Sequence, residues 1–298
     1  MEGQLERAAN VRLYFCNWLP DAAGRLSSPA GHPHPAVSLP AGRPHPAGPV
    51  LIVMHGYAEH CRRYDEFAEA LLARGIGVCR FDARGHGRSS GQRGYVRRFE
   101  DYVDDLAAFV EQVAAAHPQR SLALLGHSNG GLIAARAVQR GLPQVRALAL
   151  TSPLFALPRA RQPVPDGVAR LLSAALGRLP LPNGIRSADL THDAALQAAH
   201  AADPWVHGCA TPRWYWSMTL AGRAAIDEAQ RVKLPLLSVI GGRDVVVDTD
   251  AVRAFHERAG SSDKQLLERG GELHEVLNET NRAQLFEHIA DWLGRVLR

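Results

Sequence analysis

The 298-residue sequence has few cysteines, almost no lysine and no long apolar run. It contains no CxxC pair, which argues against a zinc ribbon, a redox motif or a disulfide framework. No apolar run approaches the roughly 18 residues that a transmembrane helix needs. The amino-terminal residues lack a basic stretch followed by an apolar one, so we expect no signal peptide and a cytoplasmic protein.

The chain is mildly basic, with a formal net charge of +4 and a pI of about 9.1. Nearly all of the positive charge is arginine, because lysine occurs only at Lys233 and Lys264. The arginines are scattered, and the densest basic stretch, residues 83–98, has no ladder of aromatic residues for stacking on bases. We therefore expect no nucleic-acid partner. The charge does suit a transient contact with an anionic lipid surface.

Apolar strand patterns and helix patterns alternate along most of the chain. Strands are predicted at residues 11–19, 49–54, 76–82, 121–126, 145–153, 233–242 and 263–271. Helices are predicted at residues 64–75, 99–118, 129–141, 248–260 and 278–297. Continuous apolar strands that alternate with helices are typical of a mostly parallel sheet covered on both faces, so we predict an α/β fold.

Two segments interrupt this alternation. Residues 20–49 hold eight prolines and the near-repeat GHPHPA and GRPHPA, which suits a flexible, solvated insertion better than a histidine metal site. Residues 154–232 contain several helical patterns and no clear strand, which predicts a helical cap. An ordinary helical subdomain would give the same pattern. The remaining residues, 1–153 and 233–298, form the predicted core.

The stretch LALLGHSNGG, residues 122–131, places Ser128 between glycines directly after an apolar strand and before a helix pattern. A G-x-S-x-G sequence in that context predicts a sharp strand-to-helix turn that exposes a nucleophilic serine. The alternative is a glycine-rich turn that binds phosphate. Neither a G-K-[ST] nor a GxGxxG sequence accompanies it, which weakens that alternative.

A serine hydroxyl needs a base and a group that orients the base. Asp244 follows the strand predicted at 233–242, and His274 follows the one at 263–271. Asp248 and Asp250 compete for the first role, but they precede a helix pattern and fit helix caps better. The order Ser128, Asp244, His274 is the one expected of a serine nucleophile in this architecture.

The oxyanion formed during such a reaction needs backbone N–H donors. We expect these from Asn129, directly after the serine, and from Tyr57 in the loop after the strand at 49–54. His55 and His60 lie in the same loop, but no cluster of carboxylates or cysteines supports a metal site there. We therefore expect neither a metal nor a cofactor.

Five stretches together resemble the monoglyceride lipase and lysophospholipase branch of the α/β-hydrolases, which is grouped with serine aminopeptidase-like hydrolases. They are HGYAEHCRRY (55–64), FDARGHGRSSGQRGYV (81–96), GHSNGG (126–131), GGRDVVVD (241–248) and ELHEVLNE (272–279). The resemblance covers nearly the whole chain except residues 20–49. It implies an α/β-hydrolase fold, with a helical cap over an acyl-binding tunnel.

The resemblance also implies roles for single residues. Ser128, Asp244 and His274 match the family's triad, and Tyr57 and Asn129 match its oxyanion donors. In monoglyceride lipases a Glu and an Arg help to hold the glycerol end of the substrate, and Glu59 and Arg63 stand at those positions.

The sequence departs from the family at two of these places. Leu277 stands where the animal enzymes carry a second histidine near the alcohol, and Asn129 replaces the usual Met. We count His55 and Leu277 with Glu59 and Arg63 as residues of the substrate pocket. The first departure puts strict specificity for monoacylglycerols in doubt.

From these observations we predict a serine hydrolase that cleaves carboxylic esters of single-chain lipids through an acyl-enzyme. Three alternatives stay open: a general carboxylesterase, an acyltransferase that uses the same three residues, and a non-catalytic binding protein of this fold. An intact triad argues against the last of these.

Overall fold

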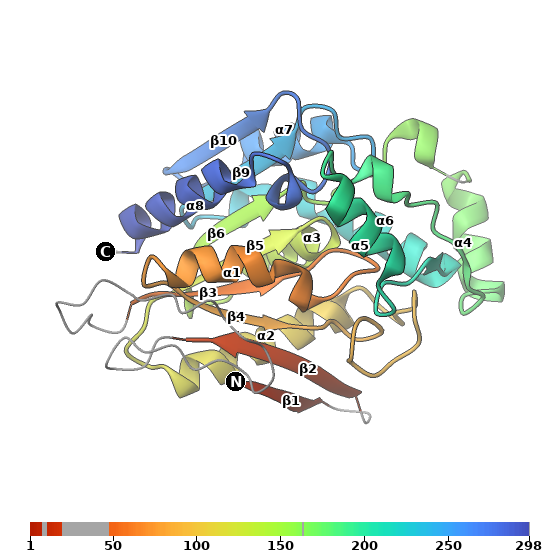
Figure 1. Ribbon diagram of the computed structural model, residues 1–298. Helices are drawn as coiled ribbons and strands as arrows, with labels where there is room; N and C mark the ends of the chain where they lie inside the picture. The colour runs from red at the N-terminus through yellow and green to blue at the C-terminus, as the bar shows by residue number, and fades with distance from the viewer. Residues whose placement is uncertain (8–10, 20–47, 163, 298) are drawn as a thin grey trace.

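The computed structural model describes residues 1–7, 11–19, 48–162 and 164–297, and its centre is an eight-stranded sheet (Figure 1). The strand order is β1 (Glu2–Arg7), β2 (Val11–Trp18), β4 (Gly77–Phe81), β3 (Val50–Met54), β5 (Leu122–His127), β6 (Val145–Thr151), β9 (Leu236–Gly241) and β10 (Lys264–Arg269). All neighbours from β4 to β10 are parallel, whereas β1 and β2 are antiparallel to each other and β2 is antiparallel to β4. The predicted mostly parallel sheet is therefore confirmed.

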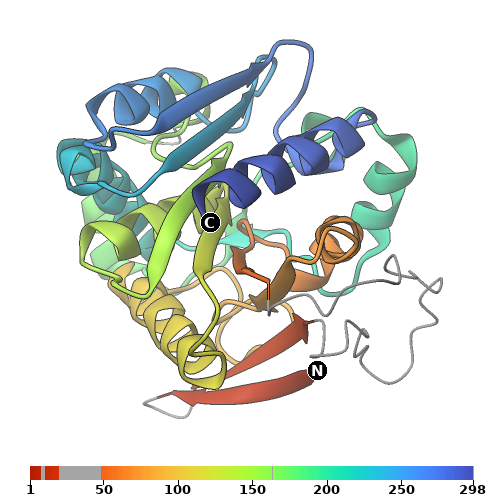
Figure 2. The same cartoon turned by 90° about the vertical axis from the view of Figure 1, so that its left-hand side faces the viewer.

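Helices cover both faces of this sheet (Figure 2). Helices α1 (Asp65–Leu72) and α8 (Arg282–Val296) cover one face, and α2 (Glu100–Ala116), α3 (Asn129–Gln139) and α7 (Thr249–Arg258) cover the other. Successive side chains of a strand point to opposite faces. In β2, accordingly, Leu13 and Phe15 pack with the second group of helices, and Tyr14 and Cys16 pack with the first.

The first strand, β1, was not expected from the sequence. Its side chains alternate between exposed and partly buried positions at the edge of the sheet, and Leu5 alone adds an apolar contact to the core. An edge strand of this kind carries no apolar run, so its pattern resembles a polar loop. The proline- and histidine-rich insertion predicted at 20–49 falls almost wholly outside the described residues.

The segment between β6 and β9 lies over the carboxyl ends of the strands (Figure 1). It contains α4 (Asp166–Ala175), α5 (Ala194–Ala202) and α6 (Pro212–Asp227), and also one pair of two-residue strands, β7 (Leu181–Pro182) and β8 (Cys209–Ala210), where no strand was expected. Helix α6 packs into the core with α3 and α7. Within the described ranges, no helix is both long and apolar enough to cross a membrane.

Candidate active site

Ser128 stands at the sharp turn between β5 and α3, in a backbone conformation that is rare for a residue with a side chain. Its φ is 51°. The glycines of the motif are needed because a Cβ on Gly126 would lie 2.4 Å from the carbonyl oxygen of Gly130, and one on Gly130 would lie 2.2 Å from that of Met54. The close approach of β5, α3 and β3 at this turn holds Ser128 in its strained conformation.

Asp244 and His274 come from the loops after β9 and β10 and meet beside this turn. The distance between His274 Nδ1 and Asp244 Oδ2 is 2.7 Å, and both side chains are almost fully buried. The other carboxylate oxygen of Asp244 accepts hydrogen bonds from the N–H groups of Val246 and Val247. The carboxylate is therefore fixed by its own loop and can fix the imidazole in turn.

Hydrogen bonds from several parts of the chain hold the loop that carries His274. The hydroxyl of Ser152 donates to the His274 carbonyl oxygen at 2.7 Å, and the N–H of Leu273 donates to the buried carboxylate of Glu279 at 2.8 Å. The N–H of Glu275 donates to the carbonyl oxygen of Leu190, which belongs to the segment between β6 and β9. Both the sheet and that overlying segment therefore position the imidazole.

The charges around the pair favour its ionised forms. Burial lowers the pKa of His274, but Asp244 outweighs this, and the pKa is raised above its ordinary value of 6.5. Burial raises the pKa of Asp244, yet its hydrogen bonds and the nearby imidazole lower it overall, so it is a carboxylate at neutral pH. His127, by contrast, is lowered to a pKa of about 4 by burial and by His274, and is neutral.

The predicted oxyanion donors face the same turn. Asn129 opens α3, where the first N–H groups of a helix have no partner within it. Tyr57 follows β3 in a turn where Ala58 has a φ of 66°. Among the described residues, neither the Tyr57 nor the Asn129 amide donates a hydrogen bond to another group. Both are thus available to a negatively charged oxygen.

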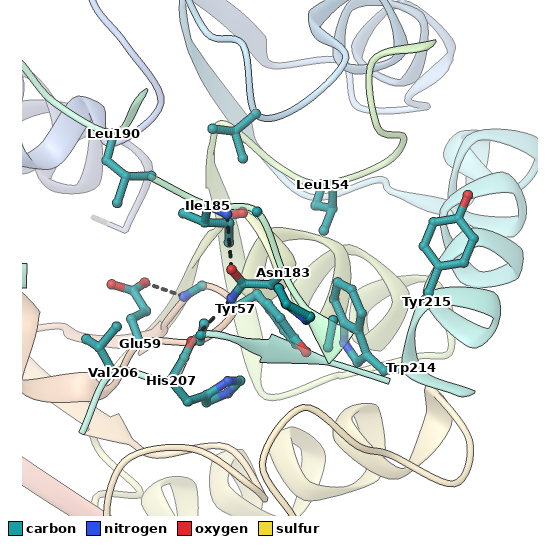
Figure 3. Close-up of a pocket in the computed structure, with 18 of the residues that line it drawn as sticks. Tyr57, Glu59, Leu154, Asn183, Ile185, Leu190, Val206, His207, Trp214 and Tyr215 are labelled. Carbon is teal, nitrogen blue, oxygen red and sulfur yellow. Dashed lines mark hydrogen bonds between the residues drawn. The ribbon is translucent and has the colours of Figure 1, made fainter. Parts of the chain in front are cut away.

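The side chain of Tyr57 joins this loop to the overlying segment (Figure 3). Its ring stacks on Trp214 of α6 with 3.7 Å between centroids, and its hydroxyl donates to the carbonyl oxygen of Cys209 at 2.9 Å. The N–H of His207 donates to the Ala58 carbonyl oxygen at 3.0 Å. The position of Tyr57, and of its amide, therefore depends on β8 and α6.

A cavity of about 800 Å³ opens above Ser128 and His274. Apolar side chains from the overlying segment make up one side of it: Leu154, Leu157, Val164, Ala169, Leu172, Trp214 and Tyr215. In Figure 3, Leu154, Trp214 and Tyr215 lie on the side opposite Glu59. The volume and the apolar wall suit a ligand with an alkyl chain.

A buried charged group lies on the other side, where Leu190 and Val206 also line the cavity. Arg63 donates to Glu59 Oε2 at 2.8 Å, and to both carboxylate oxygens of Glu275 at 2.6 and 2.8 Å. Glu59 also accepts from the Gly56 N–H and the Tyr64 hydroxyl, so it braces the loop that carries Tyr57. Sequence reasoning missed Glu275, although its place directly after His274 put it beside the reaction centre.

Two residues expected in the substrate pocket lie elsewhere. His55 is buried with its Nε2 accepting from the Ala83 N–H and its Nδ1 beside the Gly56 carbonyl oxygen, so it joins two loops behind the site. Leu277 is packed in the core under α8. Neither lines the cavity as the structure describes it, and we correct that expectation.

The two aspartates that competed with Asp244, and the loop histidine His60, also have structural partners. Asp248 caps α7 by accepting from the N–H groups of Asp250 and Ala251. Asp250 lies in the first turn of the same helix and forms an ion pair with Arg253. His60 Nε2 lies 2.7 Å from a carboxylate oxygen of Asp203. Among the described aspartates that follow β9, Asp244 is therefore the one that meets His274.

A strained serine after a parallel strand, with buried Asp and His side chains after later strands, defines an α/β-hydrolase. Comparison with known proteins identifies the family within this class. The profile of the serine aminopeptidase S33 family matches residues 45–281, and the chain belongs to that family.

Several relatives are similar over most of their length. A monoacylglycerol lipase of Mycolicibacterium smegmatis is 31% identical over 245 residues, which cover 82% of this chain and 87% of the relative. The phospholipase YtpA of Bacillus subtilis is 27% identical over 240 residues, which cover 80% and 92%. The crystal structure of the Paleococcus ferrophilus monoacylglycerol lipase matches with a TM-score of 0.74 and 27% identity, over 82% of this chain and 93% of that one. These relatives identify the chain as a carboxylic-ester hydrolase.

Proposed function

We propose that this enzyme hydrolyses carboxylic esters of single-chain lipids, with Ser128 as nucleophile, His274 as base and Asp244 as the group that orients the base. The observation that carries the proposal is the buried Asp244–His274 pair, whose imidazole lines the same cavity as Ser128, and this cavity has an apolar wall. The names of the lipase and phospholipase relatives support the same substrate class.

In the proposed reaction, Ser128 Oγ attacks the ester carbonyl carbon while His274 takes the serine proton. Asp244 stabilises the imidazolium that forms. The amides of Tyr57 and Asn129 stabilise the oxyanion. His274 then gives its proton to the leaving alcohol oxygen as the C–O bond breaks. Water, deprotonated by His274, attacks the acyl carbon of the acyl-enzyme. The bond from this carbon to Ser128 Oγ then breaks, His274 returns the proton to Oγ, and the acid is released.

We propose that residues 154–232 act as a cap that determines the preferred length of the acyl chain and contacts the lipid surface. Its α4 leaves apolar side chains exposed, with Val168 43% and Leu171 66% exposed, and Leu176, Leu179 and Leu181 follow. An apolar patch of this kind favours contact with a membrane or a partner. Leu171→Asp should reduce co-sedimentation with anionic phospholipid vesicles and leave hydrolysis of a short, water-soluble ester unchanged. Equal sedimentation of both proteins would contradict this part of the proposal.

The main experiment is a series of p-nitrophenyl esters, monoacylglycerols and lysophosphatidylcholines of increasing chain length, measured with wild type and Ser128→Ala. We expect turnover to be greatest for medium or long chains and to fall by about 10⁶ in the variant, as for other serine triads. Product analysis with added alcohol distinguishes hydrolysis from acyl transfer. A folded wild type that cleaves none of these esters would overturn the proposal.

A further inference from the structure

The cavity has an apolar wall on one side and, on the other, buried charged groups beside Leu190 and Val206. The apolar side receives the alkyl chain, because burial there removes apolar surface from water. The alcohol part of the ester is then left on the side where Glu59, Arg63 and Glu275 lie. The charge of this second side decides which alcohol groups it accepts.

Carboxylates outnumber cations on the alcohol side. Glu59 and Glu275 are both buried and share the single guanidinium of Arg63. Asp203, from the end of α5, adds a third carboxylate to the lining, and one of its oxygens lies 2.7 Å from His60 Nε2. The remaining charged residue of the lining, Arg161, lies between Leu157 and Val164 in the chain and is paired with Asp189.

Arg63 is a poor anion site, because three of its five guanidinium N–H groups already donate to two protein carboxylates that offset its charge. Nη1 donates to both glutamates, and Nη2 donates to the second oxygen of Glu275. Asn278 donates to that same oxygen, which fixes Glu275 in place. A phosphate that bound Arg63 would have to displace Glu275 and approach Glu59 as well.

Two histidines that line this side, His200 and His207, do not supply the missing positive charge. Burial and the neighbouring Arg63 lower the pKa of His200 in α5. Burial and Arg93 lower the pKa of His207 to about 4. Both line the cavity, and both are therefore neutral near pH 7.

We infer that the carboxylates of Glu59, Glu275 and Asp203 make the alcohol side select against esters with anionic alcohol groups, and that Glu275 is the main specificity-determining residue. The inference rests on the proposed ester hydrolysis and narrows its substrate class to single-chain esters of neutral or cationic alcohols. A like charge brought next to buried carboxylates is strongly unfavourable, whereas a polyol or an ammonium group is not.

Three esters with the same acyl chain test this: monolauroylglycerol, lauroylcholine and lauroyl glycerol phosphate, below their critical micelle concentrations. Because the acyl part is shared, ratios of kcat/KM between them isolate the charge of the alcohol. For wild type we expect the phosphate ester to be at least about tenfold poorer than the glycerol ester, and the choline ester to be no poorer.

Glu275→Gln removes one charge and keeps the size of the side chain. We expect it to raise the ratio of phosphate ester to glycerol ester about tenfold and to lower the ratio of choline ester to glycerol ester. Any effect of the substitution on His274 changes kcat/KM equally for all three esters, so it cancels in these ratios. Glu228→Gln is the matched control, because Glu228 pairs with Arg136 and Arg231 outside the cavity lining.

If Glu275→Gln does not fold, Asp203→Asn tests the same sign of effect at another carboxylate of the alcohol side. Equal hydrolysis of the phosphate and glycerol esters by wild type would overturn the inference and leave ester hydrolysis intact. Ratios that do not change in either folded variant would also overturn it. A wild type that cleaves none of the three esters contradicts the proposed function itself.

Discussion

The cavity has a floor, which carries Ser128 and His274, and a roof, which is the overlying segment with its helix α4. The two are held in place by different kinds of contact. On the floor, Ser128 and His274 stand on loops fixed by backbone hydrogen bonds and by backbone segments too close for any side chain. On the roof, α4 exposes Val168 and Leu171 to solvent, and its Ala169 and Leu172 line the cavity. This difference places the chemistry on the more closely packed part of the molecule, and we propose that α4 contributes to the choice of acyl chain.

The largest effect should come from the floor, in Asp244→Asn. We expect kcat for a soluble ester to fall by about 10⁴, as in other serine triads, because the amide no longer fixes and stabilises the imidazole. The remaining activity should extend to lower pH, since Asp244 raises the pKa of His274. Asp248→Asn is the control, as its carboxylate caps α7, and near-normal kcat is expected. Equal losses in the two variants would contradict the assignment.

Two glycine substitutions test whether the floor is packed more closely than the roof. Gly130→Ala places a Cβ 2.2 Å from the Met54 carbonyl oxygen, so we expect a loss of about 2 kcal/mol or more in the free energy of unfolding, with strongly reduced activity. Gly167→Ala in α4 meets nothing within 4 Å, so stability should rise by about 0.5 kcal/mol or more. Denaturant unfolding measures both, and similar losses would show that the roof is as tightly packed as the floor.

The contact between floor and roof can be weakened by Tyr57→Phe. This removes the hydroxyl that donates to Cys209 and keeps the ring stacked on Trp214. If the hydrogen bond contributes about 1 kcal/mol to the position of the oxyanion amide, kcat falls about fivefold while KM changes little. Tyr215→Phe, which also alters a tyrosine of the cavity wall, should leave kcat unchanged. A change in KM alone would assign Tyr57 to substrate binding instead.

The smallest expected effect is a shift in the pH at which kcat/KM reaches half of its maximum. His274 must be neutral to accept the serine proton, so activity is lost as the pH falls through its pKa. Because Asp244 raises that pKa, kcat/KM for a soluble ester should rise with pH through a midpoint above 6.5. A midpoint at or below this value would mean that burial outweighs the carboxylate in the working enzyme.

The sequence was sufficient for the features that depend on local pattern. Continuous apolar strands predicted the parallel sheet, and the positions of Ser128, Asp244 and His274 after strands predicted that their loops meet at one edge. Their catalytic roles remain a proposal. The polar edge strand β1 carried no such pattern, and neither did the two-residue strands β7 and β8.

Contacts between distant segments could not be predicted. The ion pair of Arg63 with Glu275 joins residues 212 positions apart. No sequence pattern near either residue predicts it. His55 was expected to face the substrate, but the Ala83 N–H holds it behind the site. Which way a loop side chain points depends on partners that only the folded chain brings near.

The central claim is that Ser128 is the nucleophile activated by His274, and labelling with a fluorophosphonate probe tests it most directly. We predict one adduct per chain, mapped to Ser128 by peptide mass spectrometry, absent in Ser128→Ala and formed much more slowly in Asp244→Asn. A folded wild type that is not labelled, or that is labelled at another residue, would contradict the account.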